Sequence, residues 1–355
     1  MDLLNAVALS LIHGISRPRA AAVFKELRAQ TSRAVALEEV IAACGADERA
    51  DSLARRARDE AASLIERARA AGIAPIRSDD DAYPPMLRAI ADPPPVLWAR
   101  GALDALNRPA VAIVGSRAAT PYATEVAARL AAELAGRQVV VVSGLARGVD
   151  GAAHRGSVQA GGRTIAVMGS GPDVIYPREH DGLAASICRD GALVSELGPG
   201  APPLPEHFPL RNRLISGISL GVVVVEASEK SGSLITARCA LDQGRDVMAV
   251  PGSVLGGRNR GSHALLKDGA KVVETADDIL EELGWPALGE APKISGNPLI
   301  QDELLSKLTP GEAYDLDELS ATVEMDASKL LPRLTEWELE GRLIKVSGGR
   351  YTLAH

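Results

Sequence analysis

Between Ala110 and Val273 the chain alternates short β-branched runs with Ala- and Leu-rich stretches of helical character. The runs are apolar at successive positions, as parallel strands covered by helices on both faces require. This order predicts an α/β fold with a Rossmann-like, doubly wound sheet. The predicted strands are Ala110–Val114, Gln138–Val142, Thr164–Met168, Ala192–Ser195, Val222–Glu226, Asp246–Val250 and Lys271–Val273.

The segments on either side of this core differ from it. Residues 1–75 show helical spacing, as in Leu3, Val7 and Leu11. The turn Gly14–Pro18 is typical of a helix-hairpin-helix (SAM-like) domain that binds DNA phosphates, although simple helix packing is the interpretation we favour. A Pro-rich stretch over Tyr83–Pro95 predicts an extended connector.

The alternating pattern stops near Gly284. A Gly- and Pro-rich segment follows, and then come three helical segments, Leu299–Leu308, Leu316–Val323 and Asp326–Glu340, with a hairpin signal around Ser347-Gly348-Gly349. Three helices and a hairpin are typical of a winged helix. The predicted domains are 1–75 (helical), 76–284 (extended Rossmann-like), 285–297 (linker) and 298–355 (winged helix).

Composition at first argues against a nucleic-acid binder. The 355 residues include 39 basic and 46 acidic side chains, a net charge of -7, and only two Phe, three Trp and five Tyr. Nucleic-acid binders usually carry a basic surplus, and single-strand binders carry stacking aromatics. No apolar run is long enough for a membrane span, the N-terminus lacks a basic signal-peptide region, and Cys44, Cys188 and Cys239 form no metal or disulfide pattern. We therefore expect a cytoplasmic protein without a metal.

Glycine, serine and a nearby cation follow most of the predicted strands. Gly115-Ser116-Arg117, Ser143–Asp150 and Lys230–Thr236 are examples. Ligands of open α/β sheets bind beyond the carboxyl ends of the strands, where backbone N–H groups, hydroxyls and cations hold phosphates. The first loop is not G-x-G-x-x-G and no P-loop occurs, so no nucleotide cofactor is expected. The pattern favours a surface that follows a run of phosphates.

The segment Pro205–Ser216 places Phe208 beside Arg211, Asn212 and Arg213. This grouping suits a base stacked between phosphates, and equally a core phenylalanine beside surface ion pairs. Catalytic candidates are few. We interpret Asp150 as a helix cap and His154 as a packing or hydrogen-bonding residue rather than as an acid–base pair.

The motifs resemble those of the DNA-processing protein A (DprA/Smf) family: GSR at 115–117, SGLARGVDGAAH at 143–154, YPREH at 176–180, HFPLRNRLISGIS at 207–219, VVVEASEKSGSLITA at 223–237, VPGS at 250–253 and DGA at 268–270. The resemblance implies a non-enzymatic, homodimeric protein that binds and protects single-stranded DNA and helps load RecA in natural transformation. It also implies a binding site, with no cofactor, made of Ser116, Arg117, Gly144, Arg147, Arg178, Phe208, Arg211, Asn212, Arg213, Lys230, Ser231, Gly232 and Ser233.

Three features qualify this picture. Pro205 and Glu206 stand where many relatives carry a lysine, and Gly261-Ser262-His263 replaces a G-x-N element, while Arg258 and Arg260 are candidates to compensate. From Pro298 onward the chain has eleven acidic residues and six basic ones, so we expect this module to contact protein rather than DNA.

The alternative function is a phosphoribohydrolase-like nucleotide-processing enzyme, although the loop Glu229–Thr236 lacks that group's glutamate.

Overall fold

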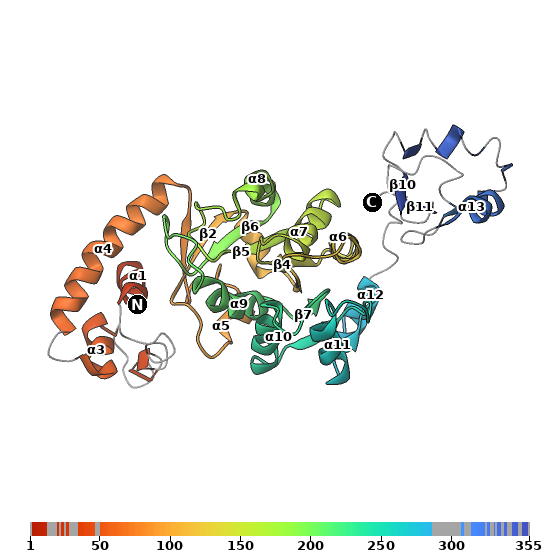
Figure 1. Ribbon diagram of the computed structural model, residues 1–355. Helices are drawn as coiled ribbons and strands as arrows, with labels where there is room; N and C mark the ends of the chain where they lie inside the picture. Colours follow the sequence, from red (N-terminus) through yellow and green to blue (C-terminus); the bar gives the residue numbers. More distant parts are fainter. Residues whose placement is uncertain are drawn as a thin grey trace. The chain divides into compact units, whose positions relative to one another are not determined.

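A computed structural model shows two compact units, Met1–Gly289 and Glu290–His355 (Figure 1). The structure describes residues 2–12, 20, 23–24, 26–27, 35–46 and 50–285, and in the second unit 307–308, 314–323, 325–326, 330, 332–334, 337–338, 343–346 and 350–353. The boundary predicted between residues 75 and 76 lies inside a strand, Ala74–Arg77, and the predicted linker lies almost wholly outside the described residues. The predicted domain limits stay predictions.

The first unit is built around a nine-stranded sheet with the order β1-β2-β6-β5-β4-β3-β7-β8-β9. The pairs β1–β2 and β2–β6 are antiparallel and all other pairs are parallel. The strands are β1 (Ala74–Arg77), β2 (Val96–Gly101), β3 (Ala110–Val114), β4 (Val140–Ser143), β5 (Thr164–Val167), β6 (Ala192–Ser195), β7 (Gly221–Val224), β8 (Asp246–Ala249) and β9 (Lys271–Val272).

The predicted α/β class is confirmed, and the seven predicted strands are present with ends shifted by at most two residues. The edge strand β1 and its neighbour β2 were not predicted. The interpretation of Tyr83–Pro95 as wholly extended is wrong, because helix α5 (Pro85–Arg88) lies within it. Pro84 is the residue before this helix and Pro85 its first residue, a place where proline's missing N–H costs nothing.

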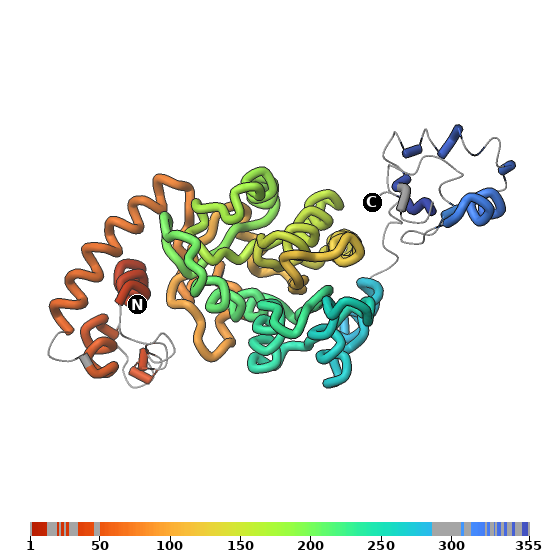
Figure 2. The backbone as a smooth tube through the Cα atoms, viewed as in Figure 1, coloured from red at the N-terminus to blue at the C-terminus, as the bar shows by residue number. Residues whose placement is uncertain are grey.

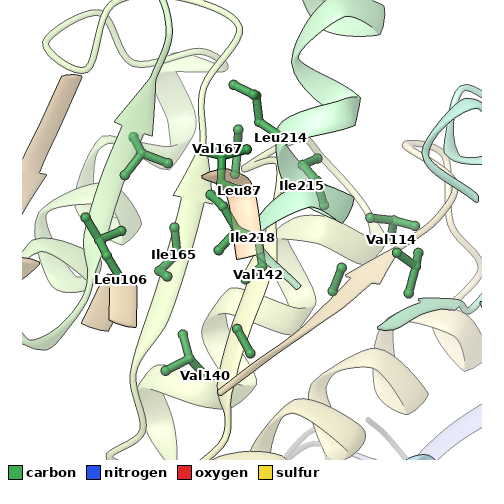
Figure 3. Close-up of a cluster of buried hydrophobic side chains, with 14 of the residues drawn as sticks. Leu87, Leu106, Val114, Val140, Val142, Ile165, Val167, Leu214, Ile215 and Ile218 are labelled. Carbon is green, nitrogen blue, oxygen red and sulfur yellow. The ribbon is translucent and has the colours of Figure 1, made fainter. Parts of the chain in front are cut away.

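Helices cover both faces of the parallel strands. Alternate strand residues, such as Val111 and Ile113, pack against α6 (Pro121–Gly136), α7 (Val149–Gln159) and α12 (Ala276–Glu282), and their neighbours pack against α5, α9 (His207–Ile218) and α10 (Ser233–Asp242). Figure 3 shows the face covered by α5, α9 and α10, where Leu214, Ile215 and Ile218 of α9 lie over the strand residues. The remaining helices of this region are α8 (Asp181–Asp190) and α11 (Arg260–Lys267), with 3₁₀ turns η3 (Leu103–Asn107) and η4 (Arg178–His180).

The N-terminal helices α1 (Leu3–Leu11), α3 (Leu37–Ile41) and α4 (Ala50–Ala70), with the π-helical turn η1 (Ala42–Ala46), share a separate apolar core with β2. Trp98 of β2, which is 1% exposed, belongs to this cluster. Residues Gly14–Pro18, the predicted hairpin turn, lie outside the described residues.

In the second unit, α13 (Leu316–Val323) lies where a helix was predicted, and β10 (Leu343–Val346) pairs with β11 (Arg350–Leu353) as the hairpin signal indicated. Asp315 caps α13 by accepting hydrogen bonds from the N–H groups of Asp317 and Glu318. A small core of Leu319, Trp337 and Leu343 joins these elements. The winged helix itself stays a prediction. Of the helices within the described residues, none has both the length and the apolar composition of a membrane span.

Candidate functional site

The strand order reverses at β3. The chain runs from β3 outward through β4 and β5 to β6, and then returns to β7 on the other side of β3. In Figure 2 the tube passes through this region in the same order, from yellow through green to teal. Loops after β3 and β7 therefore diverge, which is where open α/β sheets bind ligands. A cavity of about 600 Å³ lies there, between the loop after β3, the beginning of α9 and the beginning of α10.

Eight of the thirteen predicted site residues line this cavity: Ser116, Arg117, Phe208, Arg211, Asn212, Ser231, Gly232 and Ser233. The other five, Gly144, Arg147, Arg178, Arg213 and Lys230, do not. The cavity wall also contains Tyr176, the prolines Pro203, Pro205 and Pro209, and the carboxyl-bearing Asp150. The predicted segments thus meet at one edge of the sheet, as their position after successive strands requires.

An aromatic pair and a cation form one wall. The rings of Phe208 and Tyr176 are 5.6 Å apart, centroid to centroid, and tilted by 53°. The guanidinium carbon of the exposed Arg117 lies 5.1 Å from the Phe208 centroid, within the range of a cation–π contact. Phe208 is half-buried and Tyr176 is 44% exposed, so both rings keep surface on which a planar group can stack.

Arg211 has a structural position under this wall. Its side chain is buried and donates hydrogen bonds to the carbonyl oxygens of Gly144, at 2.8 Å, and Val167. It therefore ties the ends of β4 and β5 to α9. Burial lowers the pKa of Arg211 to about 10, while Asp150 opposes that shift, so the guanidinium stays charged at neutral pH.

Asp150 is not a helix cap. The residue before α7 is Gly148, and the Asp150 carboxylate instead accepts a hydrogen bond from the Gly144 N–H at 3.2 Å. Burial raises the pKa of the Asp150 carboxyl, and the charge of Arg211 and the N–H groups of Ala146 and Gly144 oppose it. Asp150 organises the turn 144–148. Its partners Gly144 and Ala146 precede it in the chain, whereas the N–H groups that a helix cap binds follow it, so a capping pattern does not identify this role.

His154 has the predicted hydrogen-bonding role. Its Nδ1 is 2.7 Å from the Thr164 hydroxyl, which itself donates to the Val141 carbonyl. The imidazole must therefore carry its proton on Nδ1. The Nε2 atom is buried without a partner. Burial and the nearby His180 and Arg211 lower the pKa of His154 to about 3, so this ring is neutral in the folded protein.

The floor of the cavity joins two helices. Asn212 of α9 donates to the carbonyl of Gly232, at 3.2 Å, just before α10 begins. The hydroxyls of Ser231 and Ser233 lie 2.8 Å apart at the same helix start. Hydroxyls and a helix N-terminus thus face a cavity that the Arg117 side chain also lines. This combination suits an anionic ligand.

Two of the predicted cations are engaged elsewhere. Arg213 contacts Asp92 at 3.1 Å and Glu196 at 2.5 Å, and its side chain is only 12% exposed. Arg147 forms two hydrogen bonds of 2.6 Å with Glu179 on the surface. Arg178 and Lys230 are exposed close to the cavity in sequence: Arg178 begins η4, two residues after Tyr176, and Lys230 precedes Ser231.

Glu226, which follows the apolar run of β7, was missed as a site residue. Its carboxylate accepts hydrogen bonds from the Thr120 hydroxyl at 2.6 Å and the Thr120 N–H at 3.3 Å, and its carbonyl accepts from the Ser116 N–H at 2.8 Å. It therefore fixes both ends of the loop that carries Arg117. An acid at the end of an apolar strand was the available signal.

The chain is similar to several known proteins. A family model described as DNA recombination-mediator protein A matches residues 74–284. Protein Smf of Escherichia coli is 43% identical over 284 residues, covering 77% of this chain and 76% of that protein. DNA processing protein DprA of Streptococcus pneumoniae is 47% identical over 203 residues, covering 57% and 72%.

Two solved structures are similar to this chain. That of DNA processing protein A from Streptococcus pneumoniae has a TM-score of 0.71 at 36% identity and covers 79% of this chain and 99% of its own. That of DNA processing protein A from Helicobacter pylori, reported for its single-stranded DNA binding mode, has a TM-score of 0.54 at 30% identity and covers 59% and 95%. With the family model matching more than half of its residues, the chain belongs to the DNA recombination-mediator protein A family.

Proposed function

We propose that this protein is a non-enzymatic, cytoplasmic mediator that binds and protects single-stranded DNA and helps load RecA onto it, as a homodimer, during natural transformation or recombination. The cavity at the sheet edge is the observation that carries the proposal. It joins Arg117, the stacking surface of Phe208 and the hydroxyls around the start of α10 in about 600 Å³ of open space. Family membership supports the same function.

Each part of the cavity has a chemical role in this proposal. Arg117 binds a phosphate, and Phe208 stacks on the adjoining base with Tyr176 beside it. Ser231 and Ser233, with the N–H groups at the start of α10, bind a second phosphate. Arg211 holds the loop ends in place from below, because its donors are directed at backbone carbonyls.

The negative net charge is compatible with this role because the charges are unevenly distributed. Eleven acidic residues against six basic ones follow Pro298, whereas Arg117, Arg178 and Lys230 gather at one sheet edge of the first unit. Charges that lie more than a screening length of about 8 Å from a bound phosphate chain are largely screened. The local potential at that edge therefore determines the electrostatic attraction.

Affinity for single- and double-stranded oligonucleotides at two salt concentrations tests the proposal. We expect tighter binding of the single strand, little dependence on base sequence, and a salt dependence that Arg117→Ala reduces. Equal affinity for both forms, or no effect of Arg117→Ala, would contradict it.

The geometry gives less support to a nucleotide-processing enzyme. Asp150, the carboxylate of the cavity, already accepts backbone hydrogen bonds and faces Arg211. Hydrolysis of nucleoside monophosphates that persists through many turnovers and is lost in Asp150→Asn would establish the enzyme instead.

A further inference from the structure

The loop between β8 and α11, residues 251–259 and here named the β8 loop, has a defined shape. The Ser253 hydroxyl accepts from the Leu255 N–H at 3.1 Å, and the Asn259 side chain donates to the Ser253 carbonyl at 3.2 Å. Gly256 and Gly257 have φ values of 75° and 74°, a left-handed pair that turns the chain back. The bond between Asn259 and Ser253 therefore joins the two ends of the turn that carries Val254 and Leu255.

The β8 loop lies against the loop that carries Arg117. Arg258 donates a hydrogen bond to the Ala118 carbonyl at 2.7 Å, and Ala118 lines the cavity. At the other end, the Tyr122 hydroxyl donates to the Pro251 carbonyl at 3.1 Å. These two contacts place the β8 loop beside the cavity, next to the cation that faces Phe208.

Arg258 has guanidinium N–H groups available to bind a ligand. Its side chain is exposed, and no carboxylate pairs with it within the described part of the chain. A guanidinium has five N–H donors. The Ala118 carbonyl accepts a hydrogen bond only from Nη1, so that hydrogen bond orients the guanidinium and leaves its other N–H groups for a phosphate. The neighbouring Arg260 is less available, because it lies 3.8 Å from Glu229.

The turn of the β8 loop also exposes two apolar side chains. Val254 is 81% and Leu255 79% exposed, more than any other large hydrophobic residue among those described. Adjacent apolar side chains on this turn, beside an available guanidinium, match the two surfaces of a single strand, its bases and its phosphates.

We propose that a single strand bound in the Phe208 cavity continues over the β8 loop, with Arg258 binding a phosphate and Val254 and Leu255 contacting the bases. This inference rests on the proposed function and assigns the strand's path beyond the cavity. Continuity with the cavity through Ala118 selects DNA as the occupant. The path explains why the loop holds a cation and apolar side chains together.

Thymidine oligonucleotides of two lengths test this path. Single-strand sites span about 4 to 16 nucleotides per domain, so an oligomer of about 4 fills the cavity and one of about 20 also reaches the loop. Arg258→Ala should weaken binding of the long oligomer by about three- to tenfold and lower its logarithmic salt slope by about 0.7. Binding of the short oligomer should be unchanged.

Matched variants separate the possible outcomes. Arg108→Ala removes an exposed arginine at the amino end of β3, away from the cavity, and should change neither affinity. Arg258→Lys should restore most of the salt slope. The double substitution of Val254→Ser and Leu255→Ser should weaken the long oligomer without altering that slope.

Several results would overturn the path. If Arg258→Ala matches Arg108→Ala, the strand does not reach the loop. If it weakens both lengths equally, Arg258 acts through the Ala118 loop rather than on DNA. If the Val254 and Leu255 substitutions change the oligomeric state in sedimentation but not DNA affinity, the turn is a protein interface. Failure of the unmodified protein to bind either length would instead refute the proposed function.

Discussion

The Arg117 guanidinium lies 5.1 Å from the centre of the Phe208 ring, although 90 residues separate the two in sequence. One side chain follows β3 and the other begins α9, so only the reversal of strand order at β3 brings them together. A cation and an aromatic face in one cavity provide separate contacts for the two parts of a nucleotide.

These contacts predict separable losses. Phe208→Ala should weaken single-strand binding by about 1 to 3 kcal/mol with little change in salt dependence, because stacking involves no counterion. Arg117→Ala should lower the logarithmic salt slope by about 0.7, the change for one phosphate contact. Fluorescence titrations at several salt concentrations measure both. The reverse pattern would exchange the two roles.

Substitutions at Gly144 and Gly232 test how much the buried Arg211 contributes to stability, the second serving as the control. A Cβ at Gly144 would overlap the Arg211 guanidinium, which donates to the carbonyls of Gly144 and Val167. Displacing it leaves buried polar groups unsatisfied, at about 1 to 3 kcal/mol each. Gly144→Ala should therefore lower the free energy of unfolding by at least that amount.

Gly232→Ala is the control, because no heavy atom lies within 4 Å of its Cβ position and its φ is -62°. It should cost less than about 1 kcal/mol. Denaturant unfolding measures both variants. Equal stabilities would mean that Arg211 has another position available.

Arg213 should act on stability rather than on binding. It faces Glu196, whose side chain is 5% exposed, and removing one partner of a buried pair costs about 3 to 5 kcal/mol. Arg213→Ala should lower the free energy of unfolding by about that much and leave oligonucleotide affinity unchanged below the melting temperature. Arg108→Ala, which loses only a 3.6 Å surface contact with Asp104, should cost less than about 1 kcal/mol. A loss of affinity at full stability would return Arg213 to the DNA site.

The difference between Arg117 and Arg213 shows what sequence can and cannot predict here. Apolar runs such as Ala110–Val114 identify buried strands because burial on both faces leaves a continuous pattern. The carboxyl ends of those strands then define the edge that binds a ligand. The partners of each cation at that edge come from distant segments: Asp92 and Glu196 for Arg213, Glu179 for Arg147. No local pattern distinguishes an arginine that is free from one that is paired.

The missed strands have a similar explanation. β1 and β2 are four and six residues long, and prolines precede or interrupt them, so their sequence resembles that of loops. Their pairing with each other and with β6 stabilises them. Trp98, enclosed by the N-terminal helices, shows that β2 depends on a tertiary core that a short window of sequence does not contain.

His154 predicts a dependence of stability on pH. Its pKa is about 3 in the folded protein and about 6.5 in the unfolded chain, so the unfolded chain binds more protons between these values. The contribution to stability is complete above pH 6.5 and is lost as the pH falls toward 3. His154→Asn keeps a donor for the Thr164 hydroxyl but cannot titrate. Between pH 7 and 5 the free energy of unfolding of the unmodified protein should fall by about 2 kcal/mol more than that of the variant. Parallel curves in urea unfolding would show that His154 is protonated in the fold.

The acidic C-terminal segment predicts the effect of its removal. Residues from Pro298 onward carry eleven acidic and six basic side chains, and they belong to a compact unit separate from the cavity. A chain that ends before Pro298 should bind single-stranded oligonucleotides with unchanged or slightly higher affinity, because a net negative charge is removed. The increase should be largest at low salt, where screening is weakest. Affinity is measured at about 50 and about 200 mM salt, a range over which phosphate contacts change the affinity strongly. A large loss of affinity in the shortened chain would show that this unit contacts DNA directly, against the expectation that it contacts protein.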